Sequence, residues 1–327
     1  MAEWLVEEGI GDRRAVLLDG GEIAAARIDW PGSLKPGQVE DAILISRAAG
    51  SPRGTARFVS GEEALVDRLP REASEGARLR LEDLRSAIPE RSRRKLAQAR
   101  PTSAALCGAP TLADALRSDG QTVRLVRAFP DCGWNDLWDE AWSGNRAFSG
   151  GELHFAPTAA MTLVDIDGTL PPRDLARAAV GPLAAALRRF DVAGNLGIDF
   201  PTLESREDRR AVDSALNEAL DSWPHERTAM NGFGFIQIVS RLTRPSLLQL
   251  VQFDPGGAAA RRLLRLAERV DEPGTLLLTC NPAVRAAMRR EWLDELARRS
   301  GRQVRLVEDP ALAPEAGFAQ ALAAGPE

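Results

Sequence analysis

Carboxylates end two apolar stretches of this 327-residue chain. In LVDIDGTL (residues 163–170), Asp165 and Asp167 are separated by one isoleucine, and residues i and i+2 of a strand share a face. Asp199 ends the second stretch, LGIDF. If the stretches form neighbouring strands, Asp165 and Asp199 converge at one edge of a sheet. A strand-end acid that caps a helix, or a surface acid, is the simpler interpretation of Asp199.

Magnesium is the cation that best suits such a pair of carboxylates. It takes oxygen ligands, keeps several waters, and is usually held by one or two carboxylates together with substrate phosphate. Two close carboxylates also repel each other unless a cation lies between them. A metal held in this way can activate a water for attack on a phosphodiester. The pattern therefore predicts metal-dependent phosphodiester cleavage.

The same motif is also compatible with a second chemistry, that of a phosphatase. DIDGTL resembles the first motif of haloacid-dehalogenase-type phosphatases, which implies Asp165 as nucleophile and Asp167 as general acid/base. That family also needs a later lysine or arginine and a GDxxxD-like acidic pair. No lysine and no Gly-Asp pair follows Asp167 in this chain. A six-residue match without its partners is a weak signal.

The surrounding sequence predicts a layered α/β arrangement from residue 149 onward. A hairpin, SGGELHFAP with AMTLVDID, leads to a helix, the strand GNLGIDF, another helix and the strand GFGFIQIVSRL. A smaller α/β tail follows PGG at residues 255–257, with one long helix expected over residues 281–301. These elements would bring the carboxylates to strand ends.

The N-terminal part is predicted to be rich in strands. Residues 4–30 alternate strand-like runs with a hairpin signal, DGG. After the linker PGSLKPG, four or five short strands with turns suit a small barrel of the OB type. Residues 88–100, IPERSRRKLAQAR, are predicted to form a basic helix or arm. The basic residues of this segment either form a solvated helix face or belong to an arm that contacts phosphates.

Composition narrows the class of protein. The net charge of −5 argues against a generally basic nucleic-acid binder but leaves room for a local basic groove. No apolar run is long enough for a membrane span, and the N-terminus lacks a signal-peptide pattern, so the expected location is the cytoplasm. With three scattered cysteines and two histidines, no structural zinc site is expected.

Several stretches together resemble the RNase E/G endoribonucleases. FSGGELHFAPTAAMTLVDID is similar to that family's stretch around the first metal-binding aspartate. GIDFPTLESREDRRAV is similar to the stretch around the second, and FGFIQIVSRLTRPSL resembles a further family stretch without a gap. The N-terminal strands and the C-terminal tail also resemble their family counterparts. The resemblance covers nearly the whole chain in the right order.

The resemblance implies an α+β multidomain fold. Residues 1–34 and 101–148 would form an RNase H-like portion, and residues 35–100 an inserted OB-type RNA-binding barrel with its basic arm. Residues 149–254 would form a DNase I-like α/β catalytic domain, and residues 255–327 a small C-terminal α/β domain. The implied function is a Mg²⁺-dependent endoribonuclease, with Mn²⁺ as the alternative ion, that cleaves single-stranded RNA in processing or decay.

The resemblance also assigns roles to residues. Asp165 and Asp199 would bind the metal, and Asp167 would orient Asp165 or a metal-bound water. RNA contacts are implied for an aromatic side chain of the barrel and for four arginines: Phe58, Arg210, Arg227, Arg241 and Arg244.

The chain departs from the family pattern at several places, and these departures bear on whether the family's activity is expected. The 5′-end sensing segment and the CPxC zinc-link are missing, so a homodimer would need a zinc-independent interface. Thr202, Ser240 and Leu242 replace charged family residues, and Leu65 stands at the barrel's second aromatic position. A catalytically inactive RNA-binding protein of the same fold is therefore the main alternative, and the phosphatase is the weaker one.

Overall fold

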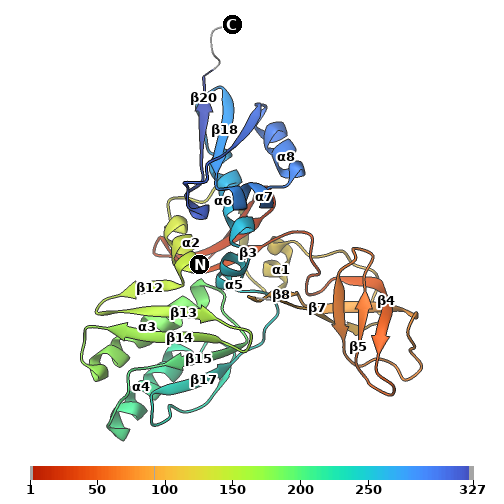
Figure 1. Cartoon of the computed structure of the whole chain (residues 1–327). Helices are drawn as coiled ribbons and strands as arrows, with labels where there is room; N and C mark the ends of the chain where they lie inside the picture. The colour runs from red at the N-terminus through yellow and green to blue at the C-terminus, as the bar shows by residue number, and fades with distance from the viewer. Residues whose placement is uncertain (1–2, 92, 324–327) are drawn as a thin grey trace.

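The computed structural model describes residues 3–91 and 93–323 and has three arms that meet at a small central sheet (Figure 1). A closed barrel, a six-stranded sheet and a three-stranded C-terminal sheet form the arms. The described residues contain eight α-helices, so the fold is of the mixed α/β class. No helix among them combines the length and the apolar character that crossing a membrane requires.

The central sheet is built from the N-terminal strands and one later strand. Its order is β11-β1-β2-β3, with bounds Val123–Val126, Trp4–Glu8, Arg13–Asp19 and Glu22–Asp29. The predicted DGG hairpin joins β2 to β3, and both of its glycines, Gly20 and Gly21, have positive φ. Helix α1 (Leu112–Ser118) covers one face, and α2 (Trp134–Ser143) packs in the core on the other.

The predicted barrel is present as a closed sheet of order β10-β6-β5-β4-β7. These strands span Ala97–Pro101, Glu63–Val66, Gly54–Arg57, Val39–Arg47 and Arg78–Arg85. Of the two forms predicted for residues 88–100, a basic helix or an arm, the helix is wrong. Short strands β8 (Ile88–Pro89) and β9 (Arg94–Lys95) precede β10 instead. Ala97 and Ala99 alternate into the barrel core while the β10 backbone bonds to β6 and β7, so period-two burial overrides helix propensity.

The six-stranded sheet has the order β12-β13-β14-β15-β17-β16. Its strands span Asn145–Phe148, Gly151–Pro157, Thr162–Gly168, Asn195–Asp199, Phe235–Val239 and Glu226–Arg227. Only β14 and β15 pair in parallel, and α3 (Pro172–Arg189) makes the crossover between them. Helix α4 (Arg206–Ala219) packs beside α3 and begins at Ser205, whose side chain accepts hydrogen bonds from two backbone amides of the first turn.

The C-terminal arm carries a sheet of order β19-β18-β20. Its elements are α5 (Leu247–Phe253), α6 (Pro255–Ala267), β18 (Thr275–Cys280), α7 (Pro282–Ala287), α8 (Arg290–Ser300), β19 (Val304–Glu308), the 3-10 turn η1 (Pro314–Ala316) and β20 (Phe318–Leu322). The single helix predicted over residues 281–301 is wrong, because Met288 is extended and inserts its side chain into the arm's core.

Two arginines of α6 fix this arm to the central sheet. Arg265 pairs with Glu7 at 3.3 Å and with Asp12 at 3.2 Å, and all three side chains are buried. Arg261 lies over the Trp30 ring at 3.9 Å and donates to the backbone oxygen of Gly11. Buried charges are stable only when they are paired in this way.

Candidate functional site

Asp165 and Asp199 lie opposite each other on neighbouring strands. The parallel register of β14 and β15 pairs them directly. Neighbouring strands are about 4.8 Å apart, so the two side chains start from adjacent positions. Asp167 follows on the same face of β14, because Val164 and Ile166, which alternate with the two aspartates, point into the core. The structure therefore brings together the three acidic side chains that the sequence singled out.

The aspartate pair belongs to a row that crosses the solvent-facing side of the sheet. Register pairs place in this row, from β12 to β17, Asn145, His154, Asp165, Asp199 and Phe235. The apolar residues that alternate with the row on β13, β14, β15 and β17 enter the core shared with α3 and α4. The sheet thus has one packed face and one face open to a ligand.

A hollow of about 340 Å³ opens beside the two aspartates. Asp165, Asp167, Asp199 and Thr202 supply its polar lining, and Leu170, Pro172, Phe200 and Pro201 are among its apolar residues. None of the lining residues is basic. The turn at its floor needs glycine, since a side chain at Gly168 would strike the Gly150 carbonyl oxygen.

The electrostatics of the pair favour a cation. Burial first and the neighbouring Asp165 charge second raise the pKa of Asp199. One Asp165 oxygen, Oδ1, accepts a hydrogen bond from the Ile166 amide at 3.0 Å. No side chain lining the hollow supplies a positive charge. A bound cation would relieve the repulsion and lower the pKa of Asp199.

The donor set fits magnesium rather than zinc. The described residues contain no group of three His, Cys, Asp or Glu side chains arranged to hold a metal. A metal here would depend on the oxygens of Asp165 and Asp199, with waters and substrate phosphate completing its shell. That is the usual coordination of magnesium. Manganese accepts the same oxygen donors.

His154 is the site residue that sequence reasoning missed. Its Nδ1 lies 3.0 Å from Asn145 Oδ1, and its Nε2 lies 3.6 Å from Glu152 Oε2 and 3.8 Å from Asp167 Oδ2. The imidazole therefore stands beside the acidic cluster on the open face. The alternation in GELHF, with Leu153 and Phe155 buried, is the signal that could have placed His154 on the Asp165 side.

The phosphatase interpretation receives no support from this arrangement. The sheet around Asp165 is mostly antiparallel, with one parallel pair. The nearest downstream arginine, Arg173, pairs with Asp208 at 2.9 Å, and the hollow has no basic lining residue that could steady a phospho-aspartate.

The four predicted RNA-contacting arginines do not gather at the hollow. Arg210 is exposed on α4. Arg227 points to the packed face and bonds Asp213 at 2.6 Å, so it ties β16 to α4. Arg241 and Arg244 follow Val239, which pairs with Asn195 at the opposite end of β15 from Asp199. Arg244 is engaged there by both oxygens of Asp191, at 2.5 and 2.9 Å.

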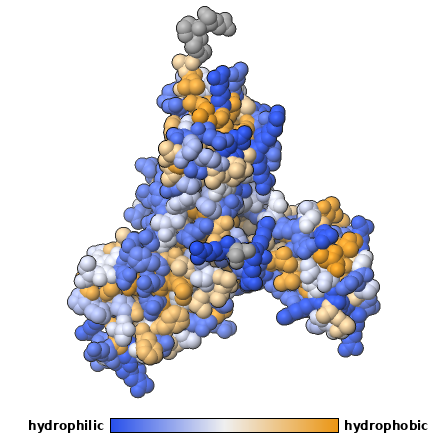
Figure 2. All heavy atoms as spheres, viewed as in Figure 1, coloured by the Kyte–Doolittle hydropathy of each residue, from blue (hydrophilic) through white to orange (hydrophobic). Residues whose placement is uncertain are grey.

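Phe58 is placed inside the barrel, where its side chain is only 3% exposed. A base could not stack on this ring without opening the barrel core. Figure 2 shows hydrophobic surface over the barrel. The large hydrophobic side chains of the barrel that are exposed are Ile43, Val59 and Leu65. Leu65 is the residue that the family pattern placed at the second RNA-contacting position.

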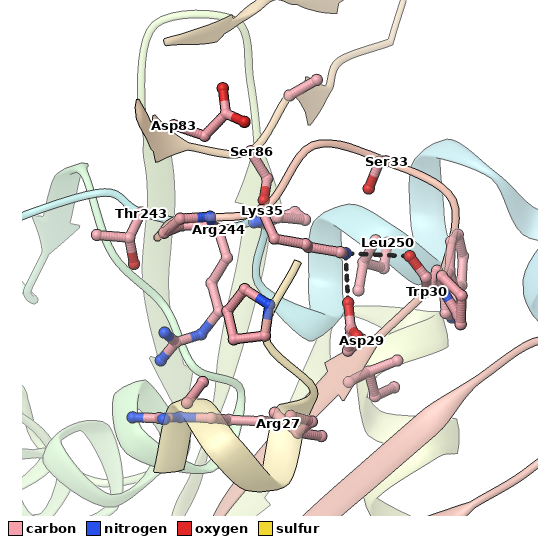
Figure 3. Close-up of a pocket in the computed structure, with 18 of the residues that line it drawn as sticks. Arg27, Asp29, Trp30, Ser33, Lys35, Asp83, Ser86, Thr243, Arg244 and Leu250 are labelled. Atoms are coloured by element: carbon pink, nitrogen blue, oxygen red, sulfur yellow. Dashed lines mark hydrogen bonds and ion pairs between the residues drawn. The ribbon is translucent and has the colours of Figure 1, made fainter. Parts of the chain in front are cut away.

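A larger cavity of about 910 Å³ lies where the barrel, the central sheet and the segment after β17 meet (Figure 3). Lys35 reaches across it to the Asp29 carboxylate and to the Trp30 carbonyl oxygen. Asp83 on the barrel side is fully buried, and neither of its carboxylate oxygens has a hydrogen-bond partner among the described residues. Burial, with the charges of nearby glutamates, raises the pKa of Asp83 to about 8.

Comparisons with known proteins add no family to this picture. Neither the models of known protein families nor the curated proteins contain a match to the chain.

Proposed function

We propose that the chain is a Mg²⁺-dependent endoribonuclease that cleaves single-stranded RNA beside Asp165 and Asp199 and acts in RNA processing or decay. The observation that carries the proposal is the register pairing of these aspartates at an open sheet face, where Asp165, Asp167 and Asp199 line one hollow. Resemblance to the RNase E/G endoribonucleases supplies the substrate class.

The chain's own residues would divide the work. Asp165 and Asp199 would hold the ion, and Asp167 on the same face would orient Asp165 or a nearby water. When bound, the ion supplies water activation and stabilises the leaving oxygen. The barrel, with its exposed side chains on β4 and β6, would hold the strand. RNase H-like, OB-type and DNase I-like assignments for the parts of the fold belong to the same proposal.

A catalytically inactive RNA-binding protein is the second candidate. The specific observation that favours it is again the lining of the hollow, since no arginine or lysine there would neutralise the scissile phosphate. In that case the aspartate pair would be a remnant of a metal site, and the barrel would carry the remaining function.

A cleavage assay with matched variants tests the proposal. Wild type, Asp165→Asn and Asp199→Asn are incubated with an end-labelled single-stranded RNA, with Mg²⁺ or with a chelator. Asp221→Asn is the control, because Asp221 is exposed beyond the C-terminal end of α4. We expect internal cuts by wild type and the control only, with at least about 100-fold slower cleavage in the two site variants. Their RNA binding should remain near normal.

Three other outcomes would overturn the proposal. Cleavage by either site variant at the wild-type rate would contradict a mechanism in which Asp165 and Asp199 hold the metal. RNA binding without cleavage by wild type would favour the inactive binding protein. Release of phosphate from p-nitrophenyl phosphate that survives Asp199→Asn would return LVDIDGTL to the phosphatase interpretation.

A further inference from the structure

The open face of the six-stranded sheet has two unlike halves, divided by the aspartate pair. On the β12–β13 side lie the polar residues Asn145, Glu152 and His154. On the β17 side, Phe235 is the register partner of Asp199 and is half-buried. The second half is therefore apolar immediately beside the proposed metal ligands.

Gly197 determines the shape of that apolar half. It sits two residues before Asp199 on the same face, and register pairs flank it with Leu163 and Gln237. A Cβ on Gly197 would lie 2.6 Å from Phe235 Cζ, 2.9 Å from Leu163 Cδ2 and 3.0 Å from the sulfur of Met161. The tip of the Phe235 ring therefore lies over the glycine, and the Leu163 and Met161 side chains lie close to the same point.

The result is an apolar surface over the buried Gly197, which we call the Gly197 platform, made by Met161, Leu163 and Phe235. Leu163 remains 39% exposed on it. Gln237 borders the platform, and no hydrogen bond of its side-chain amide is found among the described residues, although its backbone amide bonds Thr228. The amide can thus donate to and accept from a ligand lying on the platform.

We propose that the Gly197 platform is the specificity subsite of this enzyme, where Phe235 stacks one base next to the scissile phosphate and Gln237 reads its edge. This inference rests on the proposed function. An RNA base is the occupant that the surroundings favour. The platform carries one aromatic ring, adjoins the aspartates that would engage the phosphate, and has the Gln237 amide at its border. Single-stranded RNA recognition commonly combines an aromatic platform with edge contacts.

The two sides of the aspartate pair differ, so the proposal predicts which flanking nucleotide is recognised. A phosphate at the aspartates has Phe235 on one side and His154 on the other. Only one of the two flanking nucleotides would therefore meet an aromatic and apolar surface. Base preference should be strong on one side of the cut and weak on the other.

Variants at Phe235 test this in the full-length chain. Phe235→Ala removes the ring, and Phe235→Leu keeps apolar volume without an aromatic face, which guards against misfolding of the alanine variant. Phe233→Ala is the control, since Phe233 is 79% exposed in the preceding turn. Cleavage is measured on RNAs that vary one base at a time on either side of a single cut. Binding is measured without metal on an RNA that carries 2-aminopurine, whose fluorescence falls on stacking.

We expect Phe235→Ala to raise KM about ten-fold, to leave kcat within a few-fold, and to erase base preference at one flanking position. Fluorescence quenching should fall with it, Phe235→Leu should be intermediate, and Phe233→Ala should match wild type. Gln237→Ala should alter preference while retaining the quenching.

The outcomes separate this inference from the proposed function. Wild-type cleavage with an unchanged profile in Phe235→Ala overturns the platform and leaves the nuclease standing. Quenching that depends on Phe235 in a chain that never cleaves supports the platform and overturns the nuclease. A wild-type dimer in sedimentation that Phe235→Ala dissociates, without any change in RNA binding, overturns the platform in favour of self-association.

Discussion

Asp199 on the open sheet face and Asp83 at the end of the barrel are two of the carboxyl groups whose pKa values are raised, and their settings differ. Burial is the first cause in both cases. The second cause for Asp199 is one partner, Asp165, which leaves room for an ion between them. Around Asp83 the other charges are Glu62, Glu40 and Glu82, and its carboxylate oxygens have no hydrogen-bond partner within the described part of the chain.

This comparison shows that the sign of a pKa shift does not identify a functional site. At Asp199 the like charge lies beside a solvent-connected hollow, so a cation can relieve the repulsion. At Asp83 the carboxyl is enclosed, so the simplest relief is to keep its proton. The first arrangement suits ligand binding, and the second makes stability depend on pH.

The first expected effect is the response of stability to metal, which should differ between the two sites. Mg²⁺ or Mn²⁺ at about 100 times its Kd should stabilise the wild type by about 2.7 kcal/mol in thermal or urea unfolding. Asp199→Asn should lose this response, because the oxygen pair is broken. Asp83→Asn should keep it. If Mg²⁺ or Mn²⁺ still stabilises Asp199→Asn, the ion binds elsewhere, and the proposed difference between Asp199 and Asp83 is wrong.

The next effect concerns pH. The folded pKa of Asp83 is about 8, above the ordinary value of 3.8, so the folded chain holds a proton that the unfolded chain has released. Wild-type stability should therefore fall as pH rises through this window. Asp83→Asn should exceed wild type by about 2–4 kcal/mol at about pH 9 and match it at about pH 4, measured by urea unfolding. Equal stability of the two proteins at high pH would contradict the burial argument.

A smaller effect is expected at Asp167. If it only orients Asp165 or a water, Asp167→Asn should cleave nearly as well as wild type, and Asp167→Ala should lose roughly ten-fold. A phosphatase would lose its general acid/base in both variants. Single-turnover rates with RNA and with p-nitrophenyl phosphate distinguish these outcomes. Complete loss of RNA cleavage in Asp167→Asn would contradict the orienting role, and p-nitrophenyl phosphate hydrolysis that this variant abolishes would favour the phosphatase.

The smallest effect belongs to Arg241. It is exposed at the end of the sheet away from Asp199 and makes no ion pair among the described residues. If it touches a phosphate, Arg241→Ala should reduce the salt dependence of RNA binding by about one unit of log–log slope and leave kcat unchanged. An unchanged slope would confine binding to the barrel and the aspartate face.

The sequence predicted the parts of the site that depend on strand periodicity. Alternation in LVDIDGTL placed Asp165 and Asp167 on one face, and the apolar run before Asp199 predicted its neighbouring strand. The closed barrel was likewise predicted from short strands and turns. These features are local, so propensity and pattern were sufficient.

Features that depend on distant partners were not predicted. Phe58 packs inside the barrel core and fills volume there. Arg227 of β16 donates a hydrogen bond to Asp213 of α4, so it is not directed to the site. Ala97 and Ala99 form a strand only because two neighbouring strands accept them. His154 is different, because the alternation in GELHF and the predicted hairpin could have placed it beside Asp165, as the register of β13 and β14 does.

The contact of Arg265 with Glu7 and Asp12 also bears on how the chain is made. Arg265 and Asp12 are 253 residues apart in the sequence, yet their side chains pair in a buried place. During synthesis the first strands leave the ribosome long before α6 does. Asp12 therefore lacks its contact with Arg265 while the central sheet forms. The N-terminal sheet therefore reaches its final charge balance only after the C-terminal arm is translated. A chain cut before residue 255 would leave two acids of its central sheet without that arginine.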